Sequence, residues 1–243
     1  MLDEMGVRLW FPQPHSLRES TRSLPGPPSE REEANAPATS AAAIAIRSEV
    51  AQMDWATLRA AVATCTACKL CQGRTNTVFG VGNERAHWMI VGEAPGEQED
   101  LQGEPFVGKA GQLLDNMLRA IGLTREPGPA ERQVFIANTL KCRPPRNRNP
   151  EPDELAQCEP FLARQVALVQ PKIILAMGRF AVQSLLRSEE PVGRLRGRVH
   201  RYRGVPLIVT YHPAYLLRNL EDKAKAWDDL CLALDVAGKS GAR

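Results

Sequence analysis

The sequence predicts an α/β domain of three layers, in which a central, mainly parallel four-stranded sheet is covered by helices on both faces. Two observations lead to this fold class: short runs of strand type that are almost wholly apolar, and helical patterns that separate them. Strands that are buried on both faces read as continuous apolar runs, which is typical of parallel sheets. The four runs are residues 88–92, 134–137, 173–176 and 206–210.

The helices are predicted from the period of their apolar residues. In residues 111–121, Leu114, Leu118 and Ile121 recur at the spacing that places side chains on one face of a helix. In open sheets of this kind, ligands bind beyond the carboxyl ends of the strands. We therefore expect the functional site in the loops that follow Val91, Ala137 and Thr210. Patterns comparable to the first helix cover residues 154–170, 179–186 and 223–236.

The chain of 243 residues divides into a leader and one domain. Residues 12–43 are rich in Pro, Ser, Glu, Arg and Ala, and have too few large apolar side chains to offset the entropy of ordering them. We expect residues 1–50 to be a disordered leader, residues 55–237 to form the domain and residues 238–243 to be a flexible tail. Neither a membrane-spanning apolar run nor a secretory signal pattern is present, so a cytoplasmic protein is expected.

The formal net charge of +3 conceals an asymmetry along the chain. Residues 1–55 hold 5 Lys and Arg against 8 Asp and Glu, which leaves 26 against 20 for the remainder. The predicted domain is therefore the basic part of the chain. This balance is consistent with a phosphate-rich partner.

Four of the six cysteines form two pairs. Cys65 and Cys68 are separated by two residues, and Cys142 and Cys158 form a second, wider pair. The cysteines are too few and too unevenly spread for a disulfide scaffold, and a cytoplasmic protein keeps them reduced. Four thiolates suit either zinc or an iron–sulfur cluster.

The cysteine pairs have an alternative interpretation, and the two remaining cysteines also have to be assigned. One alternative is that the paired cysteines are ordinary buried residues, as we expect for Cys231 among the leucines of the last helix. Cys71 extends the first pair into a run of the ferredoxin kind. We regard Cys71 as a spare thiol.

The loop after the first predicted strand is rich in Gly and Pro. Residues 91–100 read VGEAPGEQED, and residues 103–111 read GEPFVGKAG. Such a turn lets main-chain N–H groups approach a ligand closely, and Phe106 supplies a flat apolar surface. A phosphate-binding loop or a plain structural turn would fit the same residues.

Several motifs, taken together and in order, resemble those of the family-four uracil-DNA glycosylases. The motifs are GEAPG at residues 92–96, EPFVGKAG at residues 104–111, Asn138, KCRPP at residues 141–145 and YHPAYLLRN at residues 211–219. The resemblance extends from residue 65 to about residue 232. It implies an α/β enzyme that excises uracil from DNA during repair, as a monofunctional glycosylase.

The same resemblance implies a 4Fe-4S cluster. The family holds it by a CxxC pair and a later, wider pair, which here match Cys65, Cys68, Cys142 and Cys158. Hydrolysis of an N-glycosidic bond needs no electron transfer. We therefore expect the cluster to be structural and to hold the loop of residues 143–152 in place.

Three residues are expected to read the base and cleave its bond once the nucleotide has been extruded from DNA. Phe106 would stack on uracil, unless it is an ordinary core phenylalanine. The amide of Asn138 matches uracil O4 and N3–H and rejects cytosine, whereas a mere strand-end cap would leave activity intact after Asn138→Asp. In the family, His212 faces uracil O2 and stabilises the departing anion, although a lone histidine is often only a satisfied polar group.

The residue that positions the attacking water is less clearly defined by the sequence than the three residues that contact the base. Ala94 stands where better-known uracil glycosylases carry an aspartate that orients water, and family-four members resemble this chain in lacking it. We expect Glu93 to act through its main chain or by positioning water, and Glu99 to shape the uracil C5 side of the pocket. The alternative for either glutamate is a solvated loop charge. Gly92, Ala94 and Gly96 are expected to line the uracil site.

A further set of residues is expected to contact DNA. Tyr215, Leu216 and Leu217 follow the His-Pro pair, and apolar side chains there would fill the gap left by the extruded base, unless the leucines begin a packed helix. Although charge runs are usually solvated faces, two of them suggest a phosphate track. The arginines of this track are Arg143, Arg146, Arg148 and Arg218, with a second run in a possible hairpin at residues 194–203.

Two rival functions stay open. A non-catalytic or covalently trapping uracil-DNA binder would have the same fold, but it would carry a basic segment ending in histidine, which residues 141–145 lack. An iron–sulfur interaction module of replication would have a vestigial pocket, against which the presence of Phe106, Asn138 and His212 argues. We expect a monomeric enzyme whose partner is uracil-containing DNA, single- or double-stranded.

Overall fold

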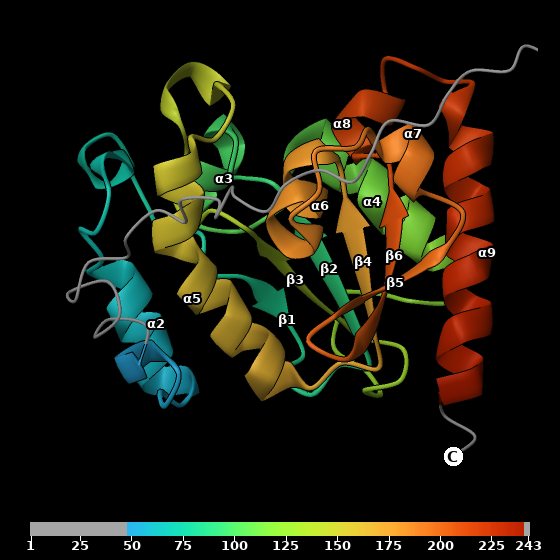
Figure 1. Ribbon diagram of the computed structural model, residues 1–243, viewed down its shortest axis with the longest axis horizontal. Coiled ribbons are helices and arrows are strands. Elements are labelled where there is room, and N and C mark those ends of the chain that lie inside the picture. The colour runs from blue at the N-terminus through green and yellow to red at the C-terminus, as the bar shows by residue number, and fades with distance from the viewer. Residues whose placement is uncertain (1–47, 241–243) are drawn as a thin grey trace, which may run out of the picture. The chain divides into compact units, whose positions relative to one another are not determined.

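Six strands form one sheet in the order β1-β3-β2-β4-β6-β5 in a computed structural model that describes residues 48–240 (Figure 1). The central strands β3, β2, β4 and β6 run parallel, whereas β1 and β5 pair antiparallel at the two edges. The strands are β1 (Val81–Gly82), β2 (Trp88–Gly92), β3 (Val134–Asn138), β4 (Ile173–Met177), β5 (Val199–Tyr202) and β6 (Val205–Thr210).

The prediction of four central parallel strands is confirmed, but the sheet is mixed and has two further strands. β1 is only two residues long, and β5 alternates exposed and more buried side chains at the sheet edge. Neither edge strand contains the continuous apolar run that marks a strand buried on both faces. The possible hairpin at residues 194–203 is present only in part: residues 199–203 belong to the β5–β6 hairpin, whose turn contains Arg203 and Gly204 in left-handed conformations, whereas Arg194 lies in the short helix Val192–Leu195.

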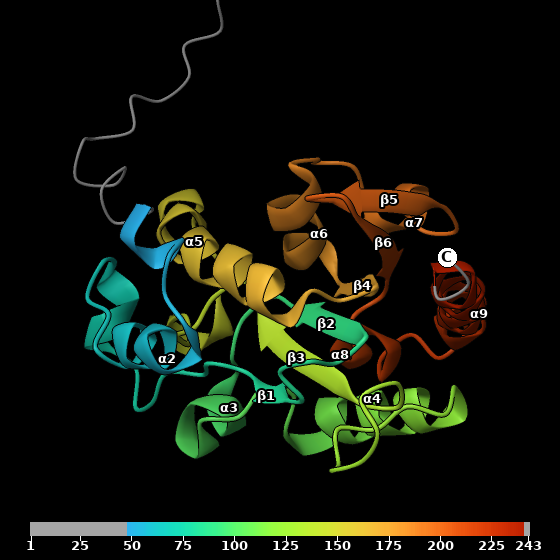
Figure 2. The same cartoon turned by 90° about the horizontal axis from the view of Figure 1, so that it is seen from below.

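Helices cover both faces of the sheet, as the three-layer prediction required (Figure 2). One face packs against α2, α5 and α6, and the other packs against α4 and α9. All four predicted helices are present, and α2, α3, α7 and α8 were not predicted. The helices are α2 (Trp55–Ala63), α3 (Glu97–Gln102), α4 (Gly108–Ala120), α5 (Pro152–Val169), α6 (Arg179–Leu186), α7 (Val192–Leu195), α8 (Pro213–Leu216) and α9 (Asp222–Ser240), with 3-10 turns η2 (Lys69–Gln72) and η3 (Pro145–Asn147).

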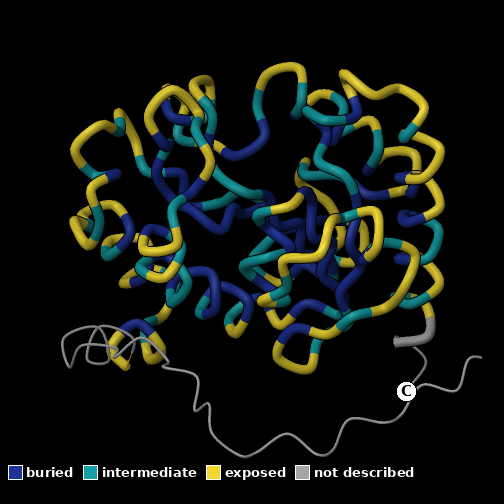
Figure 3. The backbone as a smooth tube through the Cα atoms, turned by 45° about the horizontal axis from the view of Figure 1, so that its top comes forward, coloured by how far each residue is buried: buried dark blue, intermediate teal, exposed yellow. Residues whose placement is uncertain are grey.

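Alternate residues of the central strands supply the two halves of the core. In β2, Met89 and Val91 pack against the first helix layer, whereas Trp88 and Ile90 pack against the second. The strands are therefore buried while the connecting loops stay exposed, as Figure 3 shows. The Gly92 Cα faces that of Asn138 across the β2–β3 ladder, so the carboxyl ends of these two strands lie side by side.

The described residues modify the expected domain boundaries. Residues 48–50 are helical, and Val50 is buried in the core, although both were assigned to the leader. Helix α9 continues to Ser240, beyond the expected end at residue 237. Residues 1–47 and 241–243, which hold most of the expected leader and the end of the expected tail, lie outside the described residues. Across residues 48–240, no helix has the length and apolar character that a membrane crossing requires.

Candidate active site

A cavity of about 780 Å³ lies at the carboxyl edge of the parallel strands. It is bounded by the loops that follow β2, β3, β4 and β6, as expected for an open α/β sheet. Seven of the eight residues predicted to bind the substrate line this cavity. They are Glu93, Ala94, Gly96, Glu99, Phe106, Asn138 and His212.

The floor of the cavity is a close approach among Gly92, Phe106 and Asn138. A Cβ built on Gly92 would lie 2.5 Å from Asn138 Oδ1 and 2.5 Å from Phe106 Cζ. Side chains do not tolerate contacts this short, so only glycine lets the aromatic ring and the amide meet above the end of β2. Gly92 therefore contributes by the absence of a side chain.

Phe106 and His212 stack against each other on the cavity wall. Their ring centroids are 5.2 Å apart and their planes are inclined by 25°. Phe106 is only 5% exposed, yet it lines the cavity as well as contacting the core. Phe106 is thus both a flat aromatic surface on the cavity wall, as expected, and a residue of the hydrophobic core, which was the alternative.

Asn138 ends β3 with its side chain at the cavity and is 2% exposed. The buried Lys141 donates from Nζ to the main-chain oxygen of Asn138 (2.8 Å) and to Gln165 Oε1 (2.7 Å). Burial lowers the pKa of Lys141 to about 7. Thr139 and Leu140 then donate main-chain N–H groups to the carbonyl oxygens of Gly92 and Glu93, at 3.0 Å each. These bonds fix the loop after β3 to the loop after β2.

His212 caps the N-terminus of α8. Its Nδ1 accepts the main-chain N–H of Ala214 at 3.2 Å, so in the neutral ring the proton is on Nε2. Burial, together with the charge of Arg218, lowers the pKa of His212 to about 4. At neutral pH the imidazole is therefore an uncharged donor on the wall of the cavity.

Among the carboxyl groups of the site, Glu93 is the one whose pKa is clearly shifted. Burial raises the pKa of Glu93 to about 7. Its main-chain oxygen is already occupied by hydrogen bonds from Thr139 Oγ1 (2.5 Å) and the Leu140 N–H (3.0 Å). The side chain, rather than the main-chain carbonyl, is therefore the part of Glu93 that can interact with a ligand or water.

Both carboxylate oxygens of Glu99 accept hydrogen bonds from the main chain. Oε2 accepts the Gly96 N–H and Oε1 accepts the Val107 N–H, each at 3.0 Å. Glu99 thus ties the two halves of the Gly/Pro loop together beside the cavity. The alternative of a freely solvated charge does not describe this residue.

The four paired cysteines line one small cavity, which Cys71 also contacts. Burial raises the pKa of the Cys158 thiol to about 12 and also raises that of Cys68 and Cys142. A buried thiol of this kind becomes a thiolate when a metal cation replaces its proton.

Arg74 also contacts this group, because it donates from Nη1 to Cys142 Sγ at 3.2 Å. In residues 48–240 no three His, Cys, Asp or Glu side chains are placed to hold a single metal ion. In a 4Fe-4S cluster each cysteine binds a different iron, so its ligands need not surround one point. The paired cysteines around this common cavity are compatible with such a cluster.

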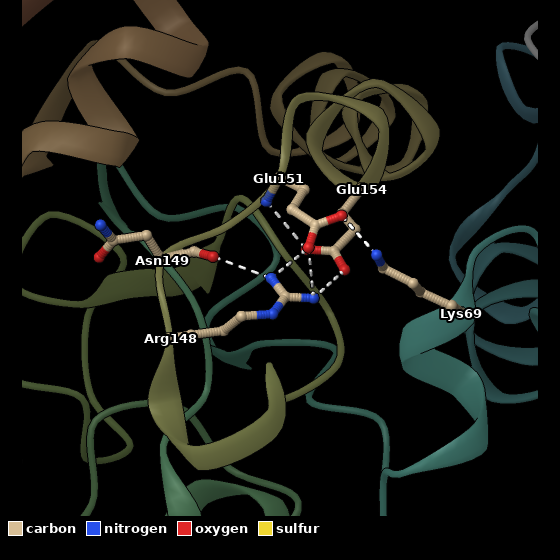
Figure 4. Close-up of polar contacts among 5 residues, drawn as sticks. All are labelled: Lys69, Arg148, Asn149, Glu151 and Glu154. Atoms are coloured by element: carbon tan, nitrogen blue, oxygen red, sulfur yellow. Dashed lines mark hydrogen bonds and ion pairs between the residues drawn. The ribbon is translucent and has the colours of Figure 1, made fainter.

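The predicted phosphate contact Arg148 is held in an ion-pair network (Figure 4). It donates to both carboxylate oxygens of the buried Glu154 at 2.9 and 2.5 Å, and to the main-chain oxygen of Asn149. Arg148 keeps the pKa of Glu154 below its ordinary value. Glu151 contacts Arg148 at 3.2 Å and also accepts a hydrogen bond from Lys69. The network joins the cysteine-bearing segment around η2 to the loop before α5.

The other predicted arginines lie in the same loop and after α8. Arg146 and Arg218 are exposed, and Arg218 lines the cavity. Arg143 donates from Nε to Asn147 Oδ1 at 2.8 Å and lies 3.5 Å from Glu97. In the hairpin run, Arg196 is paired with the buried Asp229 at 3.0 Å, so it supports α9 instead of facing solvent.

The residues after His212 separate into two groups. Tyr215 lines the cavity, stacks on Tyr211 with centroids 5.0 Å apart and donates to Asp222 at 2.6 Å. Leu216 is 1% exposed, whereas Leu217 is 40% exposed. The packed-helix alternative therefore describes Leu216, which is not placed where it could contact DNA.

One wall of the cavity was missed by the sequence reasoning. It is formed by Gly178, Arg179 and Phe180 after β4, and by Tyr211 beside them. The signal was available, because β4 was predicted and its carboxyl end belongs to the same edge of the sheet. Residues 191–193, which also line this wall, lie outside any predicted element and gave no such signal.

The fold and the site define an α/β protein with a cavity at the carboxyl edge of its parallel strands, lined by an aromatic ring, an amide and a neutral imidazole. A family model described as the uracil DNA glycosylase superfamily matches residues 79–231. The chain is 44% identical over 186 residues to a type-4 uracil-DNA glycosylase of Archaeoglobus fulgidus, covering 73% of this chain and 90% of that protein. It is 42% identical over 166 residues to a type-4 uracil-DNA glycosylase of Thermotoga maritima, covering 68% and 83%.

A more distant relative is a type-5 uracil-DNA glycosylase of Thermus thermophilus, which is 29% identical over 154 residues and is covered to 70%. The chain belongs to the uracil-DNA glycosylase superfamily and, within it, to the type-4 family.

Proposed function

We infer that this protein is a uracil-DNA glycosylase of DNA repair, which hydrolyses the N-glycosidic bond of deoxyuridine in DNA and leaves an abasic site. The observation that carries the inference is the meeting of Phe106, Asn138 and His212 at one cavity, in a chain of the type-4 family. Removing uracil requires a flat surface, a hydrogen-bonding edge and a donor for the departing anion. These three side chains supply them.

Recognition of the base is assigned to Phe106 and Asn138. An extruded base gains on the order of 1 to 3 kcal/mol by stacking on an aromatic ring. The Asn138 amide can donate to uracil O4 and accept from N3–H. Cytosine presents the opposite pattern, so its pairing with Asn138 would leave buried polar groups unsatisfied.

The Gly92→Ala variant is expected to lose at least about 100-fold in the rate of uracil excision, because its Cβ would displace the Asn138 amide or the Phe106 ring. Single-turnover excision from a uracil-containing oligonucleotide measures this loss. Gly73→Ala serves as the control, since a Cβ there would meet no heavy atom within 4 Å. Excision by Gly92→Ala within threefold of the native rate would contradict the close approach.

Bond cleavage is assigned to His212 and Glu93. Negative charge develops on uracil O2 as the bond to C1′ breaks, and the neutral Nε2–H of His212 donates a hydrogen bond to that oxygen. The carboxylate of Glu93 positions the attacking water. Since Ala94 carries no polar group, Glu93 is the titratable side chain on this part of the cavity wall.

The rate of excision is expected to rise with pH through about 7 and then to level off. The pKa of Glu93 is raised to about 7, so the fraction of its active carboxylate grows as the pH increases through that value. His212, with a pKa of about 4, stays neutral over the same range. Single-turnover rates between pH 5.5 and 8.5 test this, and Glu93→Gln should give a lower and flat profile. The same inflection in Glu93→Gln would assign it to another group.

Contacts to DNA are assigned to the rim of the cavity. Arg218 is exposed and lines the cavity, and Arg146 is exposed on the loop whose Asn147 and Arg148 line it; both are proposed to meet phosphates, together with Arg143 of the same loop. Arg148 also lines the cavity, but its network with Glu154 suggests that it shapes the loop in addition to attracting DNA. Leu217 and Tyr215 are proposed to occupy the gap left by the extruded base.

We propose a structural 4Fe-4S cluster on Cys65, Cys68, Cys142 and Cys158. When bound, the cluster would cross-link the segment before η2, the loop after β3 and α5, and the hydrolysis itself uses no electron transfer. The common cavity and the four buried or half-buried sulfurs support this assignment. The cytoplasm is the proposed compartment, because reducing surroundings preserve thiolate ligands. A monomer is proposed, since one chain supplies every side chain of the site.

The function is tested by incubating the protein with single-stranded DNA that contains one uracil, and by cleaving the abasic sites with alkali. Strand cleavage is expected for uracil and not for cytosine or thymine at the same position. A stable covalent protein–DNA adduct without turnover would indicate the trapping binder. Intact DNA in every reaction of the folded, cluster-containing protein would indicate the interaction module.

A further inference from the structure

Phe106 has a main-chain conformation that is strained for any residue except glycine. Its φ is +53°, in the left-handed region where a Cβ crowds the main chain. The ring is nevertheless buried at the cavity wall and faces His212. A strained residue persists only where surrounding contacts hold it, so the contacts of the Phe106 main chain decide where its ring lies.

Arg125 makes two of these contacts. It donates from Nη1 to the Pro105 carbonyl and from Nη2 to the Phe106 carbonyl, both at 3.2 Å. Its Nε donates to Asp115 Oδ1 at 2.7 Å, and the Arg125 side chain is only 13% exposed. One planar guanidinium thus fixes two consecutive carbonyl groups while a carboxylate on α4 orients it.

The residues on either side of Arg125 are anchored to the start of β3. The Thr124 N–H donates to the Arg132 carbonyl at 2.8 Å, and the Thr124 carbonyl accepts the Val134 N–H at 3.1 Å. Gln133 donates from Nε2 to the Glu126 carbonyl at 2.7 Å. The guanidinium is therefore carried by a segment that is itself bonded to the sheet.

Two further contacts, besides those of Arg125, hold the main chain at Phe106 and Val107. Glu99 accepts the Val107 N–H at 3.0 Å. The main chain of α4 packs so closely that a Cβ on Gly111 would lie 1.8 Å from the Phe106 oxygen. The Phe106 carbonyl is thus enclosed between α4 and Arg125.

We propose that Arg125 is a positioning residue for uracil recognition, which holds the Phe106 ring in its stacking position through the Pro105 and Phe106 carbonyls. The proposal rests on the proposed function. Arg125 is not among the described residues that line the cavity, so it acts through Phe106 and not by touching the base. Asp115 acts one step further away by orienting the guanidinium.

A double-mutant cycle tests the proposal with Arg125→Met, Phe106→Ala and the combined variant, under single-turnover conditions on single-stranded uracil DNA. Arg125→Met is expected to reduce excision about tenfold and to weaken inhibition by free uracil, as the loss of a stacking contact would. In the Phe106→Ala background the same change should alter the rate by less than about twofold. Arg125→Lys should resemble Arg125→Met, because an ammonium group cannot donate to both carbonyl groups with the fixed planar geometry of a guanidinium.

The matched control is Arg119→Met, which removes an exposed arginine of α4 bonded to Asn116 and should leave the rate unchanged. Equal losses from Arg125→Met in the native and Phe106→Ala backgrounds would overturn the proposal, because they would show a general structural role. Full activity of Arg125→Met would also overturn it. Failure of the proposed function is distinguishable, because the native protein itself would then release no uracil.

Discussion

The His212→Ala variant is expected to excise uracil about 10² to 10³ times more slowly than the native protein, the range found when a transition-state hydrogen-bond donor is removed. The reason is the fixed tautomer: Nδ1 is occupied by the Ala214 N–H, so Nε2 carries the proton that faces the departing anion. The loss should appear in the single-turnover rate with little change in DNA binding. Rates and dissociation constants measured on the same uracil oligonucleotide separate the two effects.

His200→Ala is the matched control, because this second histidine lies on β5 and contacts the Leu195 carbonyl away from the cavity. Its rate should equal that of the native protein. His212→Asn, which keeps a short N–H donor, should recover part of the lost rate. If His212→Ala instead weakened DNA binding and left the bound complex fully active, His212 would be a DNA contact and not a catalytic residue.

The Cys158→Ser variant is expected to lose the visible absorption of the cluster and to unfold with a free energy lower by about 4 kcal/mol or more, as when a metal site is lost. Cys158 is buried in α5 and shares its cavity with Cys65 and Cys68 before η2 and with Cys142 in the loop after β3. Without the cluster, buried thiols would remain where cross-links are proposed. Iron content, the visible spectrum and thermal unfolding of anaerobically purified protein measure the effect.

Two other cysteine variants complete this experiment. Cys231→Ser changes a thiol on α9 that is not among those lining the cluster cavity, and it should retain iron and stability. Cys71→Ser should also retain the cluster, although Cys71 lines the cavity, because it is regarded as a spare. Loss of iron from Cys71→Ser together with its retention in Cys158→Ser would assign the fourth ligand to Cys71.

The central sheet was predictable because its strands are buried on both faces. The runs at β2 and β4 contain no charged residue, and their boundaries differ from the prediction by at most one residue. Asn138 and His212 could be placed at strand ends for the same reason. The edge strands could not be predicted from apolar runs, because β5 has one face in solvent and carries His200 and Arg201.

The details of the site depend on contacts between residues distant along the chain. The left-handed conformation of Phe106 is held by Arg125, and no local pattern signals that the two residues meet. Glu99 reads as a loop charge until the Gly96 and Val107 N–H groups are seen to converge on it. Arg148 likewise reads as a free cation, because its partner Glu154 is buried only once α5 has packed.

The order of the strands also sets the distance between two walls of the site, and this distance limits the size of the base that fits. Asn138 and His212 follow β3 and β6, which are separated by β2 and β4, so the main chains that carry them are three strand spacings, or about 14 Å, apart. This span cannot widen without breaking a ladder of the sheet. Any redesign of the enzyme for a larger lesion must therefore shorten side chains between these two strands, because the distance between the walls is built into the hydrogen bonding of the sheet.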